Sequence, residues 1–211
     1  MALLPCLCYN ILMSDATQES VLHNIAPVWN EASEILILGT MPSPASRRAG
    51  FFYMHPQNRF WRVLPAVFGE RMEHENNAPQ RAAAIAERRD FLLRHHIALW
   101  DVLSSCDIHG ASDATIRNAV PNDFRKIFER AEIGRVFCTG KSAFSLWQKF
   151  CAGEYEAKFS VGSECLPSTS PANAAWTTEK LIAAYALVRQ SLHCAHATAI
   201  SGEMRQPILI G

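Results

Sequence analysis

The chain has 211 residues, of which 49% are hydrophobic and 19% charged, so it can bury a core and is not a disordered polymer. Its 20 basic and 20 acidic residues give a formal net charge of zero, unlike most nucleic-acid binders, although a local basic patch can still bind phosphates. No stretch approaches the ~20 apolar residues that a membrane-spanning helix needs. The N-terminal residues also lack the basic region and the cleavage site of a secretory signal. We therefore expect a soluble, cytoplasmic and monomeric protein.

The predicted elements alternate between strands and helices. Residues 1–20 are interpreted as an N-terminal extension, 21–192 as one folded domain and 193–211 as a C-terminal tail. The expected strands are 35–38, 97–102, 135–138 and 164–166, and the expected helices are 58–68, 80–95, 124–131, 141–150 and 174–192. This order predicts an α/β fold, a three-layer α/β/α sandwich with a mainly parallel central sheet.

Two loops follow expected strands at the edge where such sheets bind ligands. The first is a long segment rich in Pro, Ser and Gly at residues 40–57, and the second begins after Leu166. They are far apart in the sequence, but this topology can bring them to the same edge. Long loops in compact domains are often functional.

Several other motifs are incomplete. Residues 138–142 resemble the end of a phosphate-binding P-loop, but the glycine that the pattern needs at position 135 is Arg135. The seven cysteines contain no C-x-x-C pair, so we expect no metal and no cofactor. His95 and His96 are adjacent at a helix end and point apart. Three aspartates are candidates for an acid or base, or else for caps and turns: Asp101, Asp107 and Asp113.

The two loops carry a family resemblance. Residues 35–43 (ILILGTMPS) and 51–61 (FFYMHPQNRFW) resemble the first motif of the uracil-DNA glycosylase superfamily, whose mismatch-specific branch has G-I-N-P-G and then H-P-x-N-R-F-W. Residues 166–173 (LPSTSPAN) resemble its second motif, and residues 99–103 and 139–144 fall at the expected intermediate places. The overall pattern is most similar to the hypoxanthine-DNA glycosylase branch.

The resemblance implies a uracil-DNA glycosylase-like fold and a monofunctional enzyme. Such an enzyme flips a deaminated base, here hypoxanthine, out of double- or single-stranded DNA and hydrolyses its glycosidic bond without metal or cofactor. The implied base pocket consists of Gly39, Thr40, Met41, Pro42, Ser43, Tyr53 and His55, with Tyr53 stacking on the base unless it is a core aromatic. The implied DNA contacts are Ser168, Thr169, Ser170, Pro171, Ala172 and Asn173, at the start of the last helix, with positive charge from Arg59, Lys141, Arg47 and Arg48.

One position departs from the mismatch-specific pattern. Met41 stands where that branch has a water-positioning Asn, and a thioether cannot orient water. We therefore expect Asn58, the Asn of the H-P-x-N-R-F-W segment, to be catalytic, with its side-chain oxygen holding the water and its amide donating to the base. The alternative for Asn58 is a helix N-cap. For the whole protein, the alternatives are a non-catalytic nucleic-acid-binding protein of this fold and a small-molecule hydrolase on a related fold.

Overall fold

The computed structural model describes residues 19–110 and 112–202, and side-chain surroundings as far as residue 192. Its strands are β1 (Glu19–Leu22), β2 (Ile35–Gly39), β3 (Ile97–Asp101), β4 (Leu103–Ile108), β5 (Arg117–Pro121), β6 (Arg135–Thr139) and β7 (Gly162–Leu166). Its helices are α1 (Pro44–Ala49), α2 (Phe60–Val67), α3 (Arg81–Arg94), α4 (Arg125–Arg130), α5 (Lys141–Trp147), α6 (Gly153–Phe159) and α7 (Thr178–Gly202). A 3-10 turn, η1 (Asp113–Thr115), precedes β5, and a π-helical turn, η2 (Gln148–Ala152), joins α5 to α6.

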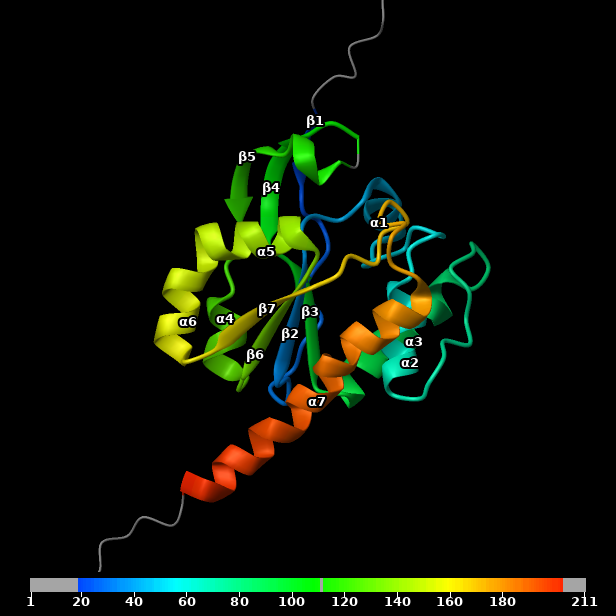
Figure 1. Cartoon of the computed structure of the whole chain (residues 1–211). Helices are drawn as coiled ribbons and strands as arrows, with labels where there is room; N and C mark the ends of the chain where they lie inside the picture. Colours follow the sequence, from blue (N-terminus) through cyan, green and yellow to red (C-terminus); the bar gives the residue numbers. More distant parts are fainter. Residues whose placement is uncertain (1–18, 111, 203–211) are drawn as a thin grey trace, which may run out of the picture.

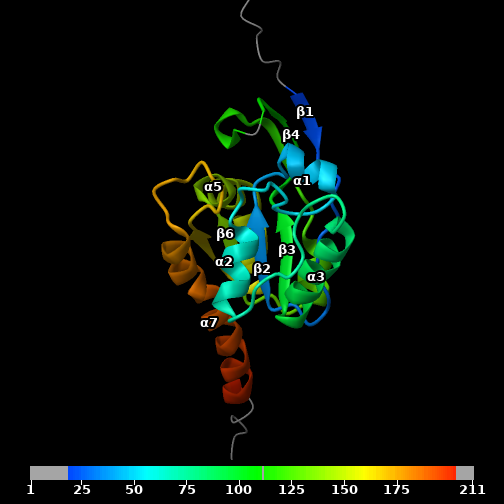
Figure 2. The same ribbon diagram turned by 90° about the vertical axis from the view of Figure 1, so that its right-hand side faces the viewer.

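The central sheet has four parallel strands in the order β3-β2-β6-β7. All five residues of β2 are buried, as expected for an apolar strand that is covered on both faces. Helices α4, α5 and α6 lie on one side of this sheet, and α2, α3 and α7 lie on the other (Figure 1, Figure 2). The three-layer α/β/α fold predicted from the sequence is confirmed.

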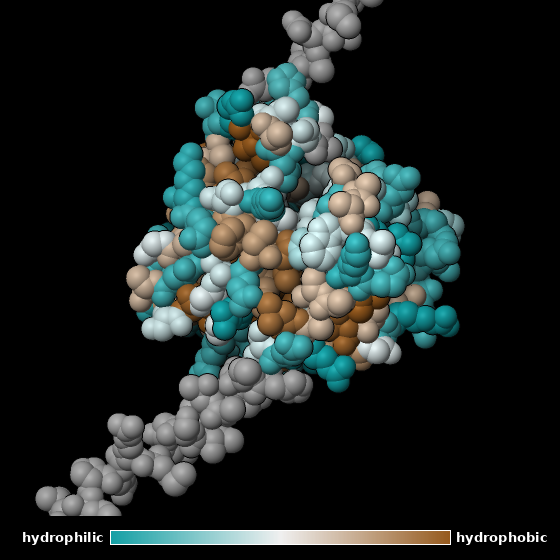
Figure 3. All heavy atoms as spheres, viewed as in Figure 1, coloured by the Kyte–Doolittle hydropathy of each residue, from teal (hydrophilic) through white to brown (hydrophobic). Residues whose placement is uncertain are grey.

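Alternate residues of β2 serve the two layers. Leu36 and Leu38 join a core that contains Trp147, whereas Ile35 and Ile37 join a second core with Phe91. The edge strand β7 runs between α5 and α7, and hydrophobic residues show at the surface along this stripe in Figure 3. The two hydrophobic cores thus hold the parallel strands in position, so that the carboxyl ends of these strands lie together at one edge of the sheet.

A second sheet was not predicted from the sequence. Strands β1, β4 and β5 form an antiparallel sheet in the order β1-β4-β5, which lies beyond the carboxyl ends of the parallel strands (Figure 1). β1 and β5 are short and largely exposed, so neither carries the apolar run that marks the central strands. Only Val102 separates β3 from β4, so the chain passes directly from one sheet to the other.

The structure also revises several boundaries. The loop expected at 40–57 contains α1, and the last helix begins at Thr178 instead of 174. Glu19 and Ser20, expected in the extension, pair with β4, and α7 runs through the expected boundary at 193 to Gly202. The rest of the expected extension (1–18) and the end of the tail (203–211) lie outside the described residues. In the described part of the chain, no helix is both long and apolar enough to cross a membrane.

Candidate active site

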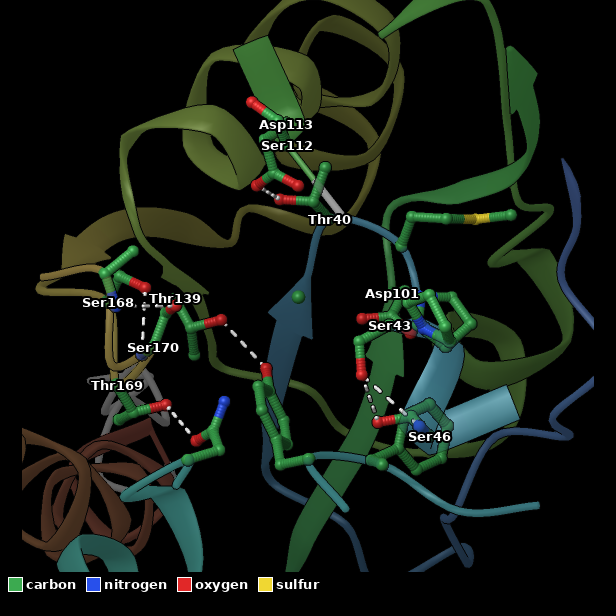
Figure 4. A pocket seen from close by; sticks show the side chains of 18 of the residues that line it. Thr40, Ser43, Ser46, Asp101, Ser112, Asp113, Thr139, Ser168, Thr169 and Ser170 are labelled. Carbon is green, nitrogen blue, oxygen red and sulfur yellow. Dashed lines mark hydrogen bonds between the residues drawn. The ribbon is translucent and has the colours of Figure 1, made fainter. Parts of the chain in front are cut away.

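A pocket of about 480 Å³ opens at the carboxyl ends of the parallel strands (Figure 4). Gly39 ends β2, Asp101 ends β3 and Thr139 ends β6, while Ser168 lies in the loop after β7, and all four residues line the pocket. The two loops singled out in the sequence therefore do meet at one edge. The volume is in the range of small-molecule sites, which are about 300–1,000 Å³.

The segment after β2 forms one wall. Its five expected residues, Gly39 to Ser43, all line the pocket. Ser43 is the N-cap of α1: its Oγ accepts a hydrogen bond from the backbone N–H of Ser46 at 3.2 Å, and Pro44 follows at the first helical position. Capping by Ser43 and the fixed backbone angle of Pro44 turn this part of the expected loop into a short helix that supports the wall.

Tyr53 forms part of the pocket and is itself held in place. Its ring stacks on Phe60, with centroids 3.9 Å apart and planes 11° apart. Because Thr139 Oγ1 donates to the carbonyl oxygen of Leu38, it accepts from the Tyr53 hydroxyl, at 2.8 Å. Burial raises the pKa of Tyr53, so the hydroxyl stays neutral. The backbone of Tyr53 is left-handed, with φ 55°. This conformation costs a non-glycine residue about 1–3 kcal/mol, so it persists only because the contacts of the ring and the hydroxyl hold the residue in place.

Asn58 lines the pocket, but its oxygen is not free to hold water. Oδ1 accepts the backbone N–H of Phe60 at 2.9 Å and the hydroxyl of Thr169 at 2.9 Å. Since the backbone N–H can only donate, Oδ1 must be the atom that faces it. The expectation that this oxygen positions the attacking water is therefore wrong. The amide nitrogen donates to no protein group among the described residues and is the atom left for a ligand.

The loop after β7 forms the facing wall. Ser168, Thr169, Ser170, Ala172 and Asn173 line the pocket, whereas Pro171 does not. Because α7 begins only at Thr178, its N-terminus does not follow Asn173 directly, as had been expected. The loop is held internally instead, for example by the bond from the Asn173 amide to the carbonyl oxygen of Ser168 at 2.9 Å.

Arg59 holds this loop through its backbone carbonyl oxygens. Its guanidinium donates to the carbonyl oxygens of Ser170 at 2.8 Å and Asn173 at 3.0 Å, and also to those of Thr169 and Trp176. Most of its N–H donors are thus used within the protein. Arg59 therefore shapes the loop, and the phosphate contact expected from the sequence has few donors left for it. Lys141 and His55 also lie off this pocket; His55 lines a neighbouring hollow that includes Arg62 and Arg88.

The site contains a buried pair that the sequence analysis did not identify. His23 Nε2 lies 2.9 Å from Asp101 Oδ2, and the two side chains are 2% and 5% exposed. The backbone N–H of Ile25 donates to His23 Nδ1 at 3.3 Å, so Nε2 carries the proton and donates to the carboxylate. Oδ1 of Asp101 lies against Gly39, where any Cβ would overlap it. Asp101 was one of three candidate aspartates, but no local signal linked it to His23, 78 residues earlier.

A second carboxyl also lines the pocket. Asp113, from η1, accepts a hydrogen bond from Thr40 Oγ1 at 2.8 Å (Figure 4). Burial raises its pKa, although the bond from Thr40 opposes the shift. Asp107, the third candidate, does not line the pocket and accepts a hydrogen bond from Asn118 instead.

In the described ranges, no group of three or more His, Cys, Asp or Glu side chains could hold a metal ion. Cys106, Cys138 and Cys151 are buried free thiols, and Cys165 is exposed. Cys6 and Cys8 lie outside the described residues. His95 and His96 pair separately, with Glu70 at 2.7 Å and with Glu34 at 3.0 Å, as expected for side chains that point apart.

Comparisons with known proteins agree with this architecture. Residues 26–192 match the family model of the uracil DNA glycosylase superfamily. A hypoxanthine DNA glycosylase of Methanosarcina barkeri is 33% identical over 138 residues, which is 65% of this chain and 82% of the relative. A hypoxanthine DNA glycosylase of Methanosarcina acetivorans is 33% identical over 150 residues, 69% of this chain and 84% of the relative.

A solved structure is similar as well. The solution NMR structure of a candidate uracil DNA glycosylase from Methanosarcina acetivorans covers 81% of this chain and 98% of its own, with a TM-score of 0.64 and 26% identity. The chain belongs to the uracil DNA glycosylase superfamily. By class it is a DNA glycosylase, as its motifs predicted.

Proposed function

We propose that this enzyme removes hypoxanthine from DNA by flipping the nucleotide and hydrolysing the bond between C1′ and N9, without a lyase step. The observation that carries the proposal is the convergence of Tyr53, Asn58 and Asp101 on one pocket at the sheet edge. These side chains supply a ring for stacking, a free amide donor and a buried carboxylate. The two hypoxanthine DNA glycosylases that resemble the chain support this choice of base.

Tyr53 and Asn58 bind the base in this proposal. One face of the Tyr53 ring is covered by Phe60, and in this proposal the flipped base stacks on the opposite face. Stacking of this kind is worth about 1–3 kcal/mol, which offsets part of the cost of extrusion. The Asn58 amide donates to the carbonyl oxygen that hypoxanthine carries where adenine has an amino group. Adenine would leave this donor facing another donor, and such mismatches discriminate strongly.

Asp101 acts on the sugar side. Bond cleavage builds positive charge on the deoxyribose, and a fixed carboxylate stabilises that charge where it develops. The donor from His23 holds Oδ2 in place and leaves Oδ1 to accept a hydrogen bond from the attacking water. In this way Asp101 supplies the water-positioning group that the thioether of Met41 cannot.

The loop at 168–173 contacts the DNA backbone in this proposal. Arg59 holds the backbone carbonyl oxygens of this loop, whose hydroxyls and amides then face the DNA, and Arg47 adds a cation on the opposite wall. DNA carrying the damaged base, double- or single-stranded, is thus the proposed partner. The monomeric state, the cytoplasmic location and the absence of a cofactor stay predictions.

Single-turnover assays on oligonucleotides that carry hypoxanthine, uracil, xanthine or mismatched thymine test the proposal. We expect release of free hypoxanthine and an abasic product that is not cleaved until base is added. Binding without release would instead indicate a non-catalytic descendant of the fold. Hydrolysis of free deoxyinosine at rates equal to those on DNA would indicate a small-molecule hydrolase.

A further inference from the structure

The proposed reaction leaves one carboxyl of the pocket, that of Asp113, without a role. Asp113 comes from the loop between β4 and β5, so the second sheet delivers it to the edge of the first. It lies across the pocket from Thr169 and beside Thr40, and it accepts a hydrogen bond from the Thr40 hydroxyl at 2.8 Å (Figure 4). Asp101 and Asp113 therefore present two carboxyls to one pocket.

The two carboxyls have different partners. Asp101 receives the N–H of His23 at 2.9 Å, whereas no Lys, Arg or His among the described residues forms an ion pair with Asp113. Arg47, a cation on the pocket wall, pairs with Glu19 at 3.6 Å. Two carboxyls in such different surroundings can take different roles in one reaction.

The groups around Asp113 favour its neutral acid. Burial raises the pKa of Asp113, the Thr40 hydroxyl lowers it, the nearby charge of Asp101 raises it further, and the Ser142 hydroxyl on α5 lowers it. The other charged or titratable groups nearby are Arg47 on α1 and Cys106 on β4. The net effect raises the pKa, so more of the acid persists toward neutral pH than for an aspartate with the ordinary pKa.

A purine needs such an acid more than a pyrimidine does. When the bond from C1′ to N9 breaks, its electron pair moves into the purine, and protonation of a ring nitrogen stabilises the departing base. Hypoxanthine has a lone pair at N7 that can take this proton, whereas uracil has no imidazole ring. We infer that Asp113 is a second catalytic residue, the acid that protonates hypoxanthine at N7 as the base departs; this inference rests on the proposed function.

The step balances without any further reactant. The carboxyl of Asp113 gives its proton to N7, and the purine accepts the electron pair of the breaking bond and leaves as the neutral base. Water adds its hydroxide to C1′, and its remaining proton passes to solvent. The Asp113 carboxylate then takes up one proton from solvent, which restores the acid for the next turnover, and the DNA product is an abasic site.

The test compares hypoxanthine with 7-deazahypoxanthine, which lacks N7, in otherwise identical duplexes under single-turnover conditions. Asp113→Asn retains the acceptor for Thr40 but cannot transfer a proton, and Asp113→Ala removes both functions. Asp107→Asn is the matched control, because that carboxylate contacts Asn118 and lies off the pocket. We expect Asp113→Asn to slow release of hypoxanthine about 10²-fold, which is typical of a lost general acid, and release of 7-deazahypoxanthine by less than about threefold.

An equal loss on both substrates would indicate a structural role and would overturn the inference. The pH dependence of the cleavage rate provides a second test, which does not need 7-deazahypoxanthine. The wild-type rate should fall as pH rises through the raised pKa of Asp113, and Asp113→Asn should lack this fall. A rate that instead rises over that range would make Asp113 a base and would contradict the inference. If the wild-type enzyme releases no hypoxanthine at any pH, the proposed function fails, and not the role of Asp113 alone.

Discussion

His23 Nε2 donates to Asp101 Oδ2 across 2.9 Å beneath the pocket, and both side chains are almost completely buried. Asp101 ends β3, within the residues that match the family model, whereas His23 follows β1 and precedes residue 26, where the match begins. A segment outside the matched region therefore orients a carboxylate inside the site. The pairing also explains why the imidazole is buried between Phe52 and Trp100.

Removing the charge of Asp101 should abolish most of the activity. We expect Asp101→Asn to lower the single-turnover rate on hypoxanthine by about 10²-fold or more, the size of effect seen when a transition-state contact is lost. His23→Ala should lower the rate less, and His23→Gln, which keeps a donor, should restore part of it. Binding to uncleaved duplex should stay within about threefold. An Asp101→Asn protein with wild-type melting temperature and wild-type rate would exclude this role.

Gly39 should tolerate no side chain. A Cβ there would overlap Asp101 Oδ1 and lie 2.9 Å from the Tyr53 hydroxyl, so Gly39→Ala must displace groups of the site. We expect a loss of about 1–3 kcal/mol in the free energy of unfolding, as in overpacked cores, together with a lower cleavage rate. Gly134→Ala is the control, because its Cβ would meet only the carbonyl oxygen of Glu34, at 3.9 Å. Similar behaviour of the two variants in denaturation and cleavage would argue against the tight fit.

The two ends of the Asn58 amide can be separated by substitution. Asp keeps the oxygen that accepts from Phe60 and Thr169, but it lacks the free N–H. Asn58→Asp should therefore keep its stability while losing about 10²-fold in rate. Asn58→Ala should lose a similar rate and also about 1 kcal/mol of stability, as when a helix-capping side chain is removed. Thermal unfolding and single-turnover cleavage measure the two effects, and an active Asn58→Asp enzyme would reduce Asn58 to a structural residue.

Arg59 should act through the loop and not through its charge. Arg59→Lys retains the charge but loses the fork that reaches the carbonyl oxygens of Ser170 and Asn173. We expect it to destabilise the fold by about 2 kcal/mol and to weaken binding to duplex DNA. Arg62→Lys, at an exposed position of α2, should change neither quantity. If Arg59→Lys binds duplex normally and changes only the salt dependence of binding, a direct phosphate contact is the better explanation.

The central sheet could be predicted because three of its strands, β2, β3 and β6, are short apolar runs that are largely buried. Ile35 to Leu38 is the plainest case. The second sheet could not be predicted, because its strands alternate weakly and its outer strands are mostly exposed. The last helix was placed too early, because small residues such as Ala172 and Ala174 have no periodicity that separates loop from helix.

The same distinction holds for the site. The two loops were found by their resemblance to family motifs, and residues 39–43 and most of 168–173 do line one pocket. The contributions of His23 and Asp113 depend on tertiary contacts of the second sheet, which no local pattern in the sequence reveals. The second partner of the Asn58 oxygen could not be predicted either, because it is the hydroxyl of Thr169, 111 residues further along the chain.

The most direct measurement of the central claim is the ratio of single-turnover excision rates for hypoxanthine and uracil, placed in matched duplexes of the same sequence. A pocket with an amide donor from Asn58, the carboxyl of Asp101 and an Asp113 whose pKa is raised should favour the purine, and we predict a ratio well above one at neutral pH. The ratio should fall when Asp113 is replaced by Asn, because only the purine uses that acid. Faster excision of uracil than of hypoxanthine by the wild-type enzyme would contradict the account.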